Sequence, residues 1–206
     1  MIKKISALLL AVAMVASLTA CGGGDKKPAA SNGGASASAA GEVAGLTEAF
    51  AESPILVTSG GQSADYQMIG TVMGKLGMDY EINNLATSAD LGDAKTLIVV
   101  VGGSSKGLGA AGIDADGELA RLEELMAGAK DAGLSIIAMH TGGEARRGDL
   151  SDKFITPVFE KADYAIVVSA GDEDGLMSGI CAGAGIPMDV IGSISDVTTV
   201  LPAAFK

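Results

Sequence analysis

The 206-residue chain contains one histidine, two cysteines and no tryptophan. A metal site built from imidazole and thiolate ligands needs several such residues together, and His140 alone does not supply them. Cys21 falls at the end of an N-terminal leader, which leaves Cys181 as the single cysteine of the domain and excludes a disulfide framework. We therefore expect neither a metal centre nor a cofactor.

Basic side chains are scarce as well. From residue 46 onward the sequence has 23 acidic and ten basic side chains, a formal charge of −13. Nucleic-acid binding requires clustered Lys and Arg that neutralise phosphates, and non-specific adhesion to an anionic bilayer has a similar requirement. The composition argues against both kinds of partner.

The first 21 residues have the form of a bacterial secretory signal. Two lysines near the start precede an apolar run over residues 5–16, which is short for a membrane span. The sequence LTAC at 18–21 resembles the lipobox of bacterial lipoproteins, in which the cysteine is acylated. We predict a signal peptide over 1–21, lipidation of Cys21, and an extracytoplasmic domain anchored to a bacterial membrane by its lipid. An uncleaved anchor is the alternative.

The rest of the chain divides into a tether and one domain. Residues 22–45 are rich in Gly, Ala and Ser, which predicts a flexible tether, and residues 46–206 alternate apolar runs with amphipathic stretches. The runs predicted as strands are 55–58, 80–85, 96–101, 134–139, 164–168 and 188–191. The stretches predicted as helices are 64–76, 114–133, 150–161, 175–184 and 196–205, with a helical turn inside 86–95.

This alternation predicts an α/β fold. We expect a single doubly wound, mostly parallel sheet of five to six strands with helices on both faces, flavodoxin-like or Rossmann-like. The favoured strand order is 2-1-3-4-5 with the sixth strand at the edge, and a different doubly wound order is the alternative.

A binding site is expected at the carboxyl ends of the strands, beside the switch in strand order between the first and third strands. Lys106, Arg146 and Arg147, three of the ten basic residues, fall in loops at that edge, together with His140. We expect the glycine-rich stretch 102–112 to be a flexible loop whose backbone N–H groups, with Lys106 and one of the arginines, bind a small anion such as a carboxylate or a phosphate. The predicted ligand-binding residues are Ser59, Gly60, Gly61, Gln62, Ser63, Gly102, Gly103, Ser104, Ser105, Lys106, Gly107, His140, Gly142, Gly143, Glu144, Arg146 and Arg147.

Two catalytic motifs match weakly at the same edge. Residues 107–112 fit the dinucleotide pattern G-x-G-x-x-G, but they begin several residues beyond the strand, and the next strand ends in His140 rather than an acidic residue. Residues 103–107 fit G-x-S-x-G, but His140 precedes any late aspartate, against the hydrolase order. A Ser105 and His140 pair stays open as an alternative. Within the loop that follows His140, Glu144 is expected to pair with Arg147.

Three segments carry a resemblance to a known family. They are ILVTSGGQSAD at 55–65, TLIVVVGGSSKGLGAAGID at 96–114 and IIAMHTGGEARRGDLSDKFI at 136–155. They resemble a family of small bacterial extracytoplasmic lipoproteins or secreted proteins catalogued as a domain of unknown function. The resemblance covers most of residues 54–206 and implies an extracytoplasmic α/β domain with no assigned activity.

Together these features predict a membrane-tethered lipoprotein that binds a small anionic solute, with a membrane transporter as a candidate partner. Two alternatives remain, a protein-interaction module of an envelope complex and a hydrolase-type enzyme that uses Ser105 and His140. We favour a binding protein over an enzyme.

Overall fold

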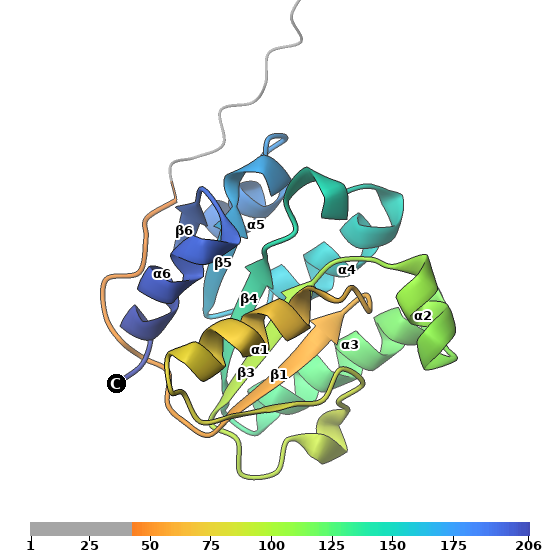
Figure 1. Cartoon of the computed structure of the whole chain (residues 1–206), viewed down its shortest axis with the longest axis horizontal. Coiled ribbons are helices and arrows are strands. Elements are labelled where there is room, and N and C mark those ends of the chain that lie inside the picture. The colour runs from red at the N-terminus through yellow and green to blue at the C-terminus, as the bar shows by residue number, and fades with distance from the viewer. Residues whose placement is uncertain (1–42) are drawn as a thin grey trace, which may run out of the picture. The chain divides into compact units, whose positions relative to one another are not determined.

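Six strands form one parallel sheet in the order β2-β1-β3-β4-β5-β6 in the computed structural model, which describes residues 43–206 (Figure 1). The strands are β1 Ile55–Gly60, β2 Tyr80–Ile82, β3 Thr96–Val101, β4 Ser135–His140, β5 Tyr164–Val168 and β6 Met188–Ile191. The predicted α/β class and the favoured strand order are confirmed. The predicted signal peptide, Cys21 and most of the predicted tether lie outside the described residues.

Helices cover both faces of the sheet (Figure 1). The α-helices are α1 Asp65–Lys75, α2 Ser105–Ala111, α3 Ala115–Asp131, α4 Asp149–Phe159, α5 Leu176–Ala184 and α6 Val197–Ala203. The short 3-10 helices are η1 Ser88–Asp90, η2 Gly143–Arg146, η3 Ser169–Gly171 and η4 Ile194–Asp196. One face packs against α1 and α6 and the other against α3, α4 and α5, so the chain changes face between β1 and β3.

The central strand β3 explains why both faces need covering. Leu97, Val99 and Val101 face the helices α3 and α4, whereas Ile98 and Val100 face α1, and all five side chains are buried. Successive side chains of a strand point to opposite faces, so a run of apolar residues requires a layer of helices on each side.

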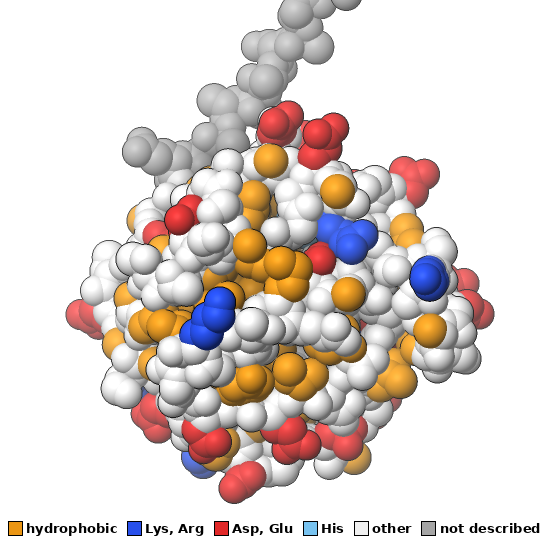
Figure 2. Space-filling model, in the orientation of Figure 1, with side chains coloured by type: hydrophobic (Ala, Val, Ile, Leu, Met, Phe, Trp, Pro, Cys, Tyr) orange, Lys and Arg blue, Asp and Glu red, His pale blue; other side chains and the backbone are white. Residues whose placement is uncertain are grey.

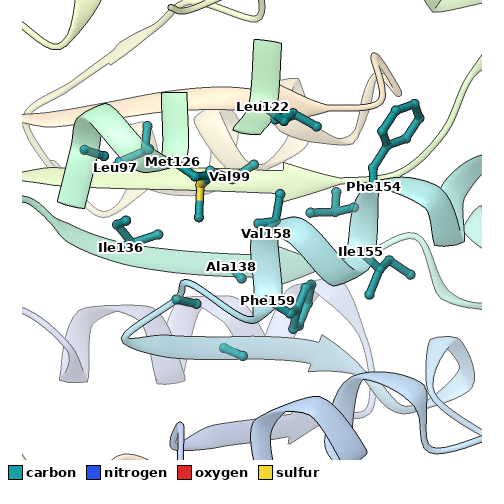
Figure 3. Close-up of a cluster of buried hydrophobic side chains, with 14 of the residues drawn as sticks. Leu97, Val99, Leu122, Met126, Ile136, Ala138, Phe154, Ile155, Val158 and Phe159 are labelled. Atoms are coloured by element: carbon teal, nitrogen blue, oxygen red, sulfur yellow. The ribbon is translucent and has the colours of Figure 1, made fainter. Parts of the chain in front are cut away.

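The core beneath α3 and α4 holds these helices on the sheet. In Figure 3, Leu122 and Met126 of α3 and Val158 and Phe159 of α4 point toward the sheet, and all four are fully buried. Burying an aliphatic or aromatic side chain of this size stabilises the fold by about 1.5–3 kcal/mol. This packing fixes the end of β3, where the next helix begins.

The glycine-rich stretch after β3 is helical, which corrects the expectation of a flexible loop. The helix α2 begins where the Ser104 side chain accepts a hydrogen bond from Gly107 N at 3.0 Å, and it ends at Gly112, whose φ of +72° closes the last turn. Glycine is a poor helix former, which is why the stretch resembles a loop in sequence. Position 107 requires a glycine because a Cβ there would overlap the Gln62 carbonyl oxygen.

Two strands differ in length from the prediction, since β1 is two residues longer and β2 is three residues shorter. The strand β2 ends at Ile82 because the Asn83 side chain accepts a hydrogen bond from Leu85 N at 3.1 Å, which turns the chain away from the sheet. At the other edge, residues 43–45 already contact the fold, since Met188 N donates to Ala44 O at 2.9 Å. No helix within residues 43–206 combines the length and apolar character needed to cross a membrane.

Candidate functional site

A cavity of about 530 Å³ opens at the carboxyl ends of β1, β2 and β3, beside the place where the chain changes face. Its volume lies within the range of about 300–1,000 Å³ that is usual for small-molecule sites. The lining residues that were predicted are Gln62, Ser104, Lys106, Gly107 and Arg146. Those that were not predicted are Ala64, Tyr66, Asn84, Leu85, Ala110 and Ala111.

A pair of amide side chains joins two of the loops that line this cavity. Gln62 Nε2 donates to Asn84 O and Asn84 Nδ2 donates to Gln62 Oε1, both at 2.8 Å. Gln62 has a φ of +61°, a backbone conformation that a non-glycine residue adopts only when its surroundings hold it there. The two hydrogen bonds supply that restraint, so the loops after β1 and β2 form one wall.

A buried ion pair holds this wall from beneath. Glu118 of α3 is fully buried, and its Oε1 accepts hydrogen bonds from Gly61 N at 2.8 Å, Gln62 Nε2 at 3.1 Å and Arg121 Nη2 at 2.7 Å. Arg121 also donates from Nη2 to Ser59 O and from Nη1 to the Ala86 carbonyl oxygen, both at 2.6 Å. One pair thus ties α3 to the loops after β1 and β2.

Sequence reasoning missed this pair, although a signal was present. Glu118 precedes Leu122 by four residues and Leu125 by seven, so helical spacing places it on the apolar face of α3. A carboxylate on a buried face needs a charged partner, and Arg121 one turn later is the obvious candidate.

Lys106 brings an unpaired positive charge to the cavity. Six of the ten basic residues after position 46 are in ion pairs with carboxylates. Within residues 43–206, Lys106 has neither an ion-pair partner nor a hydrogen-bond partner, and its side chain is exposed where it lines the cavity. In a domain with a formal charge of −13, this ammonium group is available to a ligand.

Arg146 also lines the cavity, in a position that two glycines make accessible. Its Nε donates to Asp65 Oδ2 at 3.0 Å, and Ser63 Oγ donates to the same oxygen at 3.0 Å. A Cβ on Gly142 would overlap the Arg146 side chain, and a Cβ on Gly102 would lie 2.8 Å from Ser63 Oγ. The ends of β1, β3 and β4 therefore meet at the Asp65 carboxylate.

Arg147, in contrast, does not line the cavity. It donates to Asp152 Oδ1 at 2.8 Å, to Gly171 O at 2.6 Å and to both carboxylate oxygens of Asp174 at 2.8 Å. The hydrogen bond from Arg147 lowers the pKa of Asp174 to about 2, and donating to the carboxylates of Asp174 and Asp152 raises the pKa of Arg147. Within residues 43–206 no ion pair joins Arg147 to Glu144, which corrects that prediction, because the acidic groups of α4 and of the loop before α5 saturate the guanidinium.

His140 is fully buried at the end of β4. Its Nε2 lies 3.0 Å from Arg146 O, and its Nδ1 has no hydrogen-bond partner within residues 43–206. The carbonyl oxygen can only accept, so Nε2 carries the proton and donates it. Burial lowers the pKa of His140 and the charge of Arg147 lowers it further, whereas the hydrogen bond to Arg146 O and the charge of Asp65 act in the opposite direction. The ring does not line the cavity, so a hydrolase that uses it as a base finds no support in this geometry.

The lowered pKa of His140 predicts a pH-dependent loss of stability. Since the folded-state pKa lies below the unfolded value of about 6.5, the unfolded chain binds the proton more readily, and stability falls as pH drops below about 6.5 toward the folded-state pKa. In the His140→Gln variant, whose amide can still donate to Arg146 O, this contribution disappears. Urea unfolding from pH 7.5 to 5 checks the prediction: the free-energy difference between wild type and variant should shift against the wild type on acidification, and parallel curves would contradict it.

The other predicted residues surround the cavity without lining it. Ser105 is exposed on α2, and Gly103 N donates to Ser151 Oγ at 2.8 Å. The remaining predicted residues away from the lining are Ser59, Gly60, Gly61, Ser63, Gly102, Gly142, Gly143 and Glu144. Cys181, outside this edge, is buried on α5, and burial raises the pKa of its thiol to about 11, which disfavours the reactive thiolate.

Figure 2 shows the face that carries α1 and α6. Basic side chains lie over α2 and near the loop that follows β4, the elements that supply Lys106 and Arg146. Hydrophobic side chains gather between α1 and α6. A second hollow there, of about 430 Å³, is lined by Met68, Thr71, Val72, Lys75, Ile194, Ser195 and Thr198.

Comparisons with known proteins identify a family but no activity. A family model described as Domain of unknown function (DUF6305) matches residues 52–205, which confirms the predicted resemblance to a family of unassigned function. No curated protein matches the chain. A solved structure from Thermoplasma acidophilum, described as part of a GMP synthase, is similar at 20% identity with a TM-score of 0.33; the match covers 55% of this chain and 47% of that one, so the chain spans about half of its length.

Proposed function

The chain belongs to the family described as Domain of unknown function (DUF6305), and we propose that this member binds a small organic anion in the cavity between α2 and the loops after β1, β2 and β4. The observation that carries the proposal is the unpaired ammonium group of Lys106, which faces a cavity of ligand size in a strongly acidic domain. Arg146 adds a second cationic group to the lining of the cavity.

The position and the rigidity of the cavity support this proposal. Open α/β sheets bind ligands beyond the carboxyl ends of their strands, at the point where the strand order reverses. Here that point lies between β1 and β3, and the Gln62 and Asn84 amides together with Glu118 hold the wall in place. A site that is already ordered before binding spends less free energy on ordering itself around the ligand.

Neutralising Lys106 is expected to weaken anion binding by about 10-fold to 100-fold, since a hydrogen bond to a charged group contributes about 1.5–3 kcal/mol. Organic anions should first be screened by thermal shift, because a ligand at 100 times its Kd stabilises the folded state by about 2.7 kcal/mol. Calorimetric titration of the best anion into wild type and the Lys106→Gln variant then measures the loss.

Lys95→Gln is the matched control for this measurement. Lys95 is also exposed and without an ion-pair partner in the described part of the chain, but it immediately precedes β3, at the opposite end of the strand from Lys106. The same charge change there should leave the affinity within about twofold at physiological salt, where screening acts over about 8 Å. Equal losses in both variants, or no stabilising anion at all, would contradict the proposal.

We further propose that the domain works outside the cytoplasmic membrane, held by a lipid on Cys21. The support is the sequence LTAC at 18–21 behind a charged start and a short apolar run. Incorporation of a fatty-acid analogue that is lost in the Cys21→Ser variant tests the anchor, and labelling that persists in this variant would overturn it.

A further inference from the structure

The guanidinium of Arg146 is hydrogen-bonded on its Nε side, while its two terminal nitrogens are free in the described part of the chain. Only Nε is bonded, to Asp65 Oδ2, and neither Nη1 nor Nη2 has a hydrogen-bond partner within residues 43–206. Two parallel N–H donors in a fixed plane match the two oxygens of a carboxylate. We propose that the cavity selects carboxylates carrying an apolar body, with Arg146 as the specificity-determining residue and Asp65 as the residue that positions it. This inference rests on the proposed anion-binding function and names the ligand class.

The position of Asp65 is itself built by several elements. Its side chain is nearly buried at the start of α1 and receives hydrogen bonds from Arg146 Nε and Ser63 Oγ, both at 3.0 Å. The absence of a side chain on Gly142 leaves the path that Arg146 follows to this carboxylate. The hydrogen bond to this nearly buried carboxylate therefore orients the guanidinium and leaves its Nη1 and Nη2 donors for a ligand.

The other residues that line the cavity determine which kind of group, attached to the carboxylate, binds well. Tyr66, Leu85, Ala110 and Ala111, whose side chains are largely hydrocarbon, line the same cavity as Arg146. An apolar body buried against them gains free energy in proportion to the area removed from water. Lys106, as a point charge on a flexible side chain, strengthens any anion without selecting its geometry.

Because Asp65 is negatively charged, the sign of the change in anion affinity distinguishes a positioning role from a purely electrostatic one. If Asp65 acted only through its negative charge, its removal in Asp65→Ala would strengthen the binding of any anion nearby. If Asp65 positions Arg146, the same change removes the acceptor of the Arg146 Nε–H, frees the guanidinium and weakens carboxylate binding, although a repulsive charge has been removed. The two roles therefore predict opposite changes in affinity.

The test is calorimetric titration of the full domain with four probes: benzoate, benzenesulfonate, acetate and benzamide. Benzoate and benzenesulfonate share the apolar ring but differ in the shape of the anionic group, acetate lacks the ring, and benzamide lacks the charge. We expect benzoate to bind at least tenfold tighter than each of the other three. Arg146→Lys, which keeps the charge but loses the planar pair of donors, should weaken benzoate at least tenfold and bring the benzoate to benzenesulfonate ratio close to one.

Asp65→Ala should weaken benzoate by several-fold and leave benzenesulfonate equal or tighter, whereas Ser63→Ala, which removes a donor to Asp65 Oδ2 but no charge, should weaken benzoate by less and leave benzenesulfonate unchanged. Unfolding midpoints of each variant establish that it is folded at the titration temperature. The inference is overturned if benzenesulfonate binds wild type as well as benzoate, if Arg146→Lys keeps the preference, if Asp65→Ala tightens benzoate, or if benzoate does not bind at millimolar concentration. In each of these cases the proposed anion-binding function still stands if another anion binds and Lys106→Gln weakens its binding. The proposed function falls if no anion binds.

Discussion

Replacing Glu118 by Gln is expected to lower the free energy of unfolding by about 3–5 kcal/mol, the usual result of breaking a buried ion pair from one side. The carboxylate accepts from Gly61 N, Gln62 Nε2 and the Arg121 guanidinium. A Gln amide has one acceptor oxygen and turns an NH₂ group toward at least one of these donors. Arg121 then keeps its charge in an almost buried position without a counter-ion. Urea unfolding with a fixed m-value measures the loss.

An exposed ion pair provides the control for this variant. Lys206 and Glu52 form an ion pair in which both side chains are more than half exposed, at 57% and 54%. Lys206→Gln should cost at most about 1 kcal/mol, as is usual for exposed pairs. A loss in Glu118→Gln no larger than in Lys206→Gln would show that the buried network does not hold the loops together.

The buried pair does more than join two charges, because both members also bond to buried backbone groups. Apolar replacements of a buried ion pair are often neutral, since the cost of burying two charges disappears with them. Here Arg121 also donates to the carbonyl oxygens of Ser59 and Ala86, and Glu118 accepts from Gly61 N. Apolar side chains would leave these buried backbone groups unsatisfied. The pair therefore serves as the polar connection between α3 and the two loops that line the cavity.

Sequence patterns predicted the fold because local and global signals agree in it. The run 96–101 is buried on both faces, and the alternation of such runs with amphipathic stretches requires parallel crossovers. The strand order followed from the general rule for doubly wound sheets, and the structure confirms it. The edge that carries the cavity followed from the strand order.

The individual walls of the cavity were less predictable, because they depend on contacts between distant segments. Asn84 enters the site only because Asn83 ends β2 early, and Asp65 enters through Arg146, 81 positions further along the chain. Adjacent residues also diverge: Arg146 lines the cavity, whereas Arg147 is held by Asp152 and Asp174. Composition and spacing treat the two arginines alike, and only the placement of the acidic groups around them separates their roles.

Gly61→Ala, in the loop after β1, is expected to destabilise the fold by about 2–6 kcal/mol through backbone strain and a steric collision. Gly61 has a φ of +104°, and a Cβ there would lie 2.8 Å from Gly102 O and 2.6 Å from Phe154 Cδ2. The backbone conformation costs about 1–3 kcal/mol for a residue with a side chain. The collision adds about 1–3 kcal/mol, because one neighbour is backbone and the other is a fully buried ring.

Alanine substitutions at two other glycines separate the cost of the backbone conformation from the cost of the collision. Gly148 has a φ of +109° with nothing within 4 Å, so Gly148→Ala carries only the conformational cost. Gly109 lies inside α2 with open space around it, and Gly109→Ala should stabilise the protein by about 1 kcal/mol through helix propensity. Thermal unfolding should therefore rank Gly109→Ala above wild type, then Gly148→Ala, then Gly61→Ala. If Gly61→Ala is no less stable than Gly148→Ala, the loop after β1 can move away from β3, and the wall of the cavity is not held as rigidly as carboxylate selection requires.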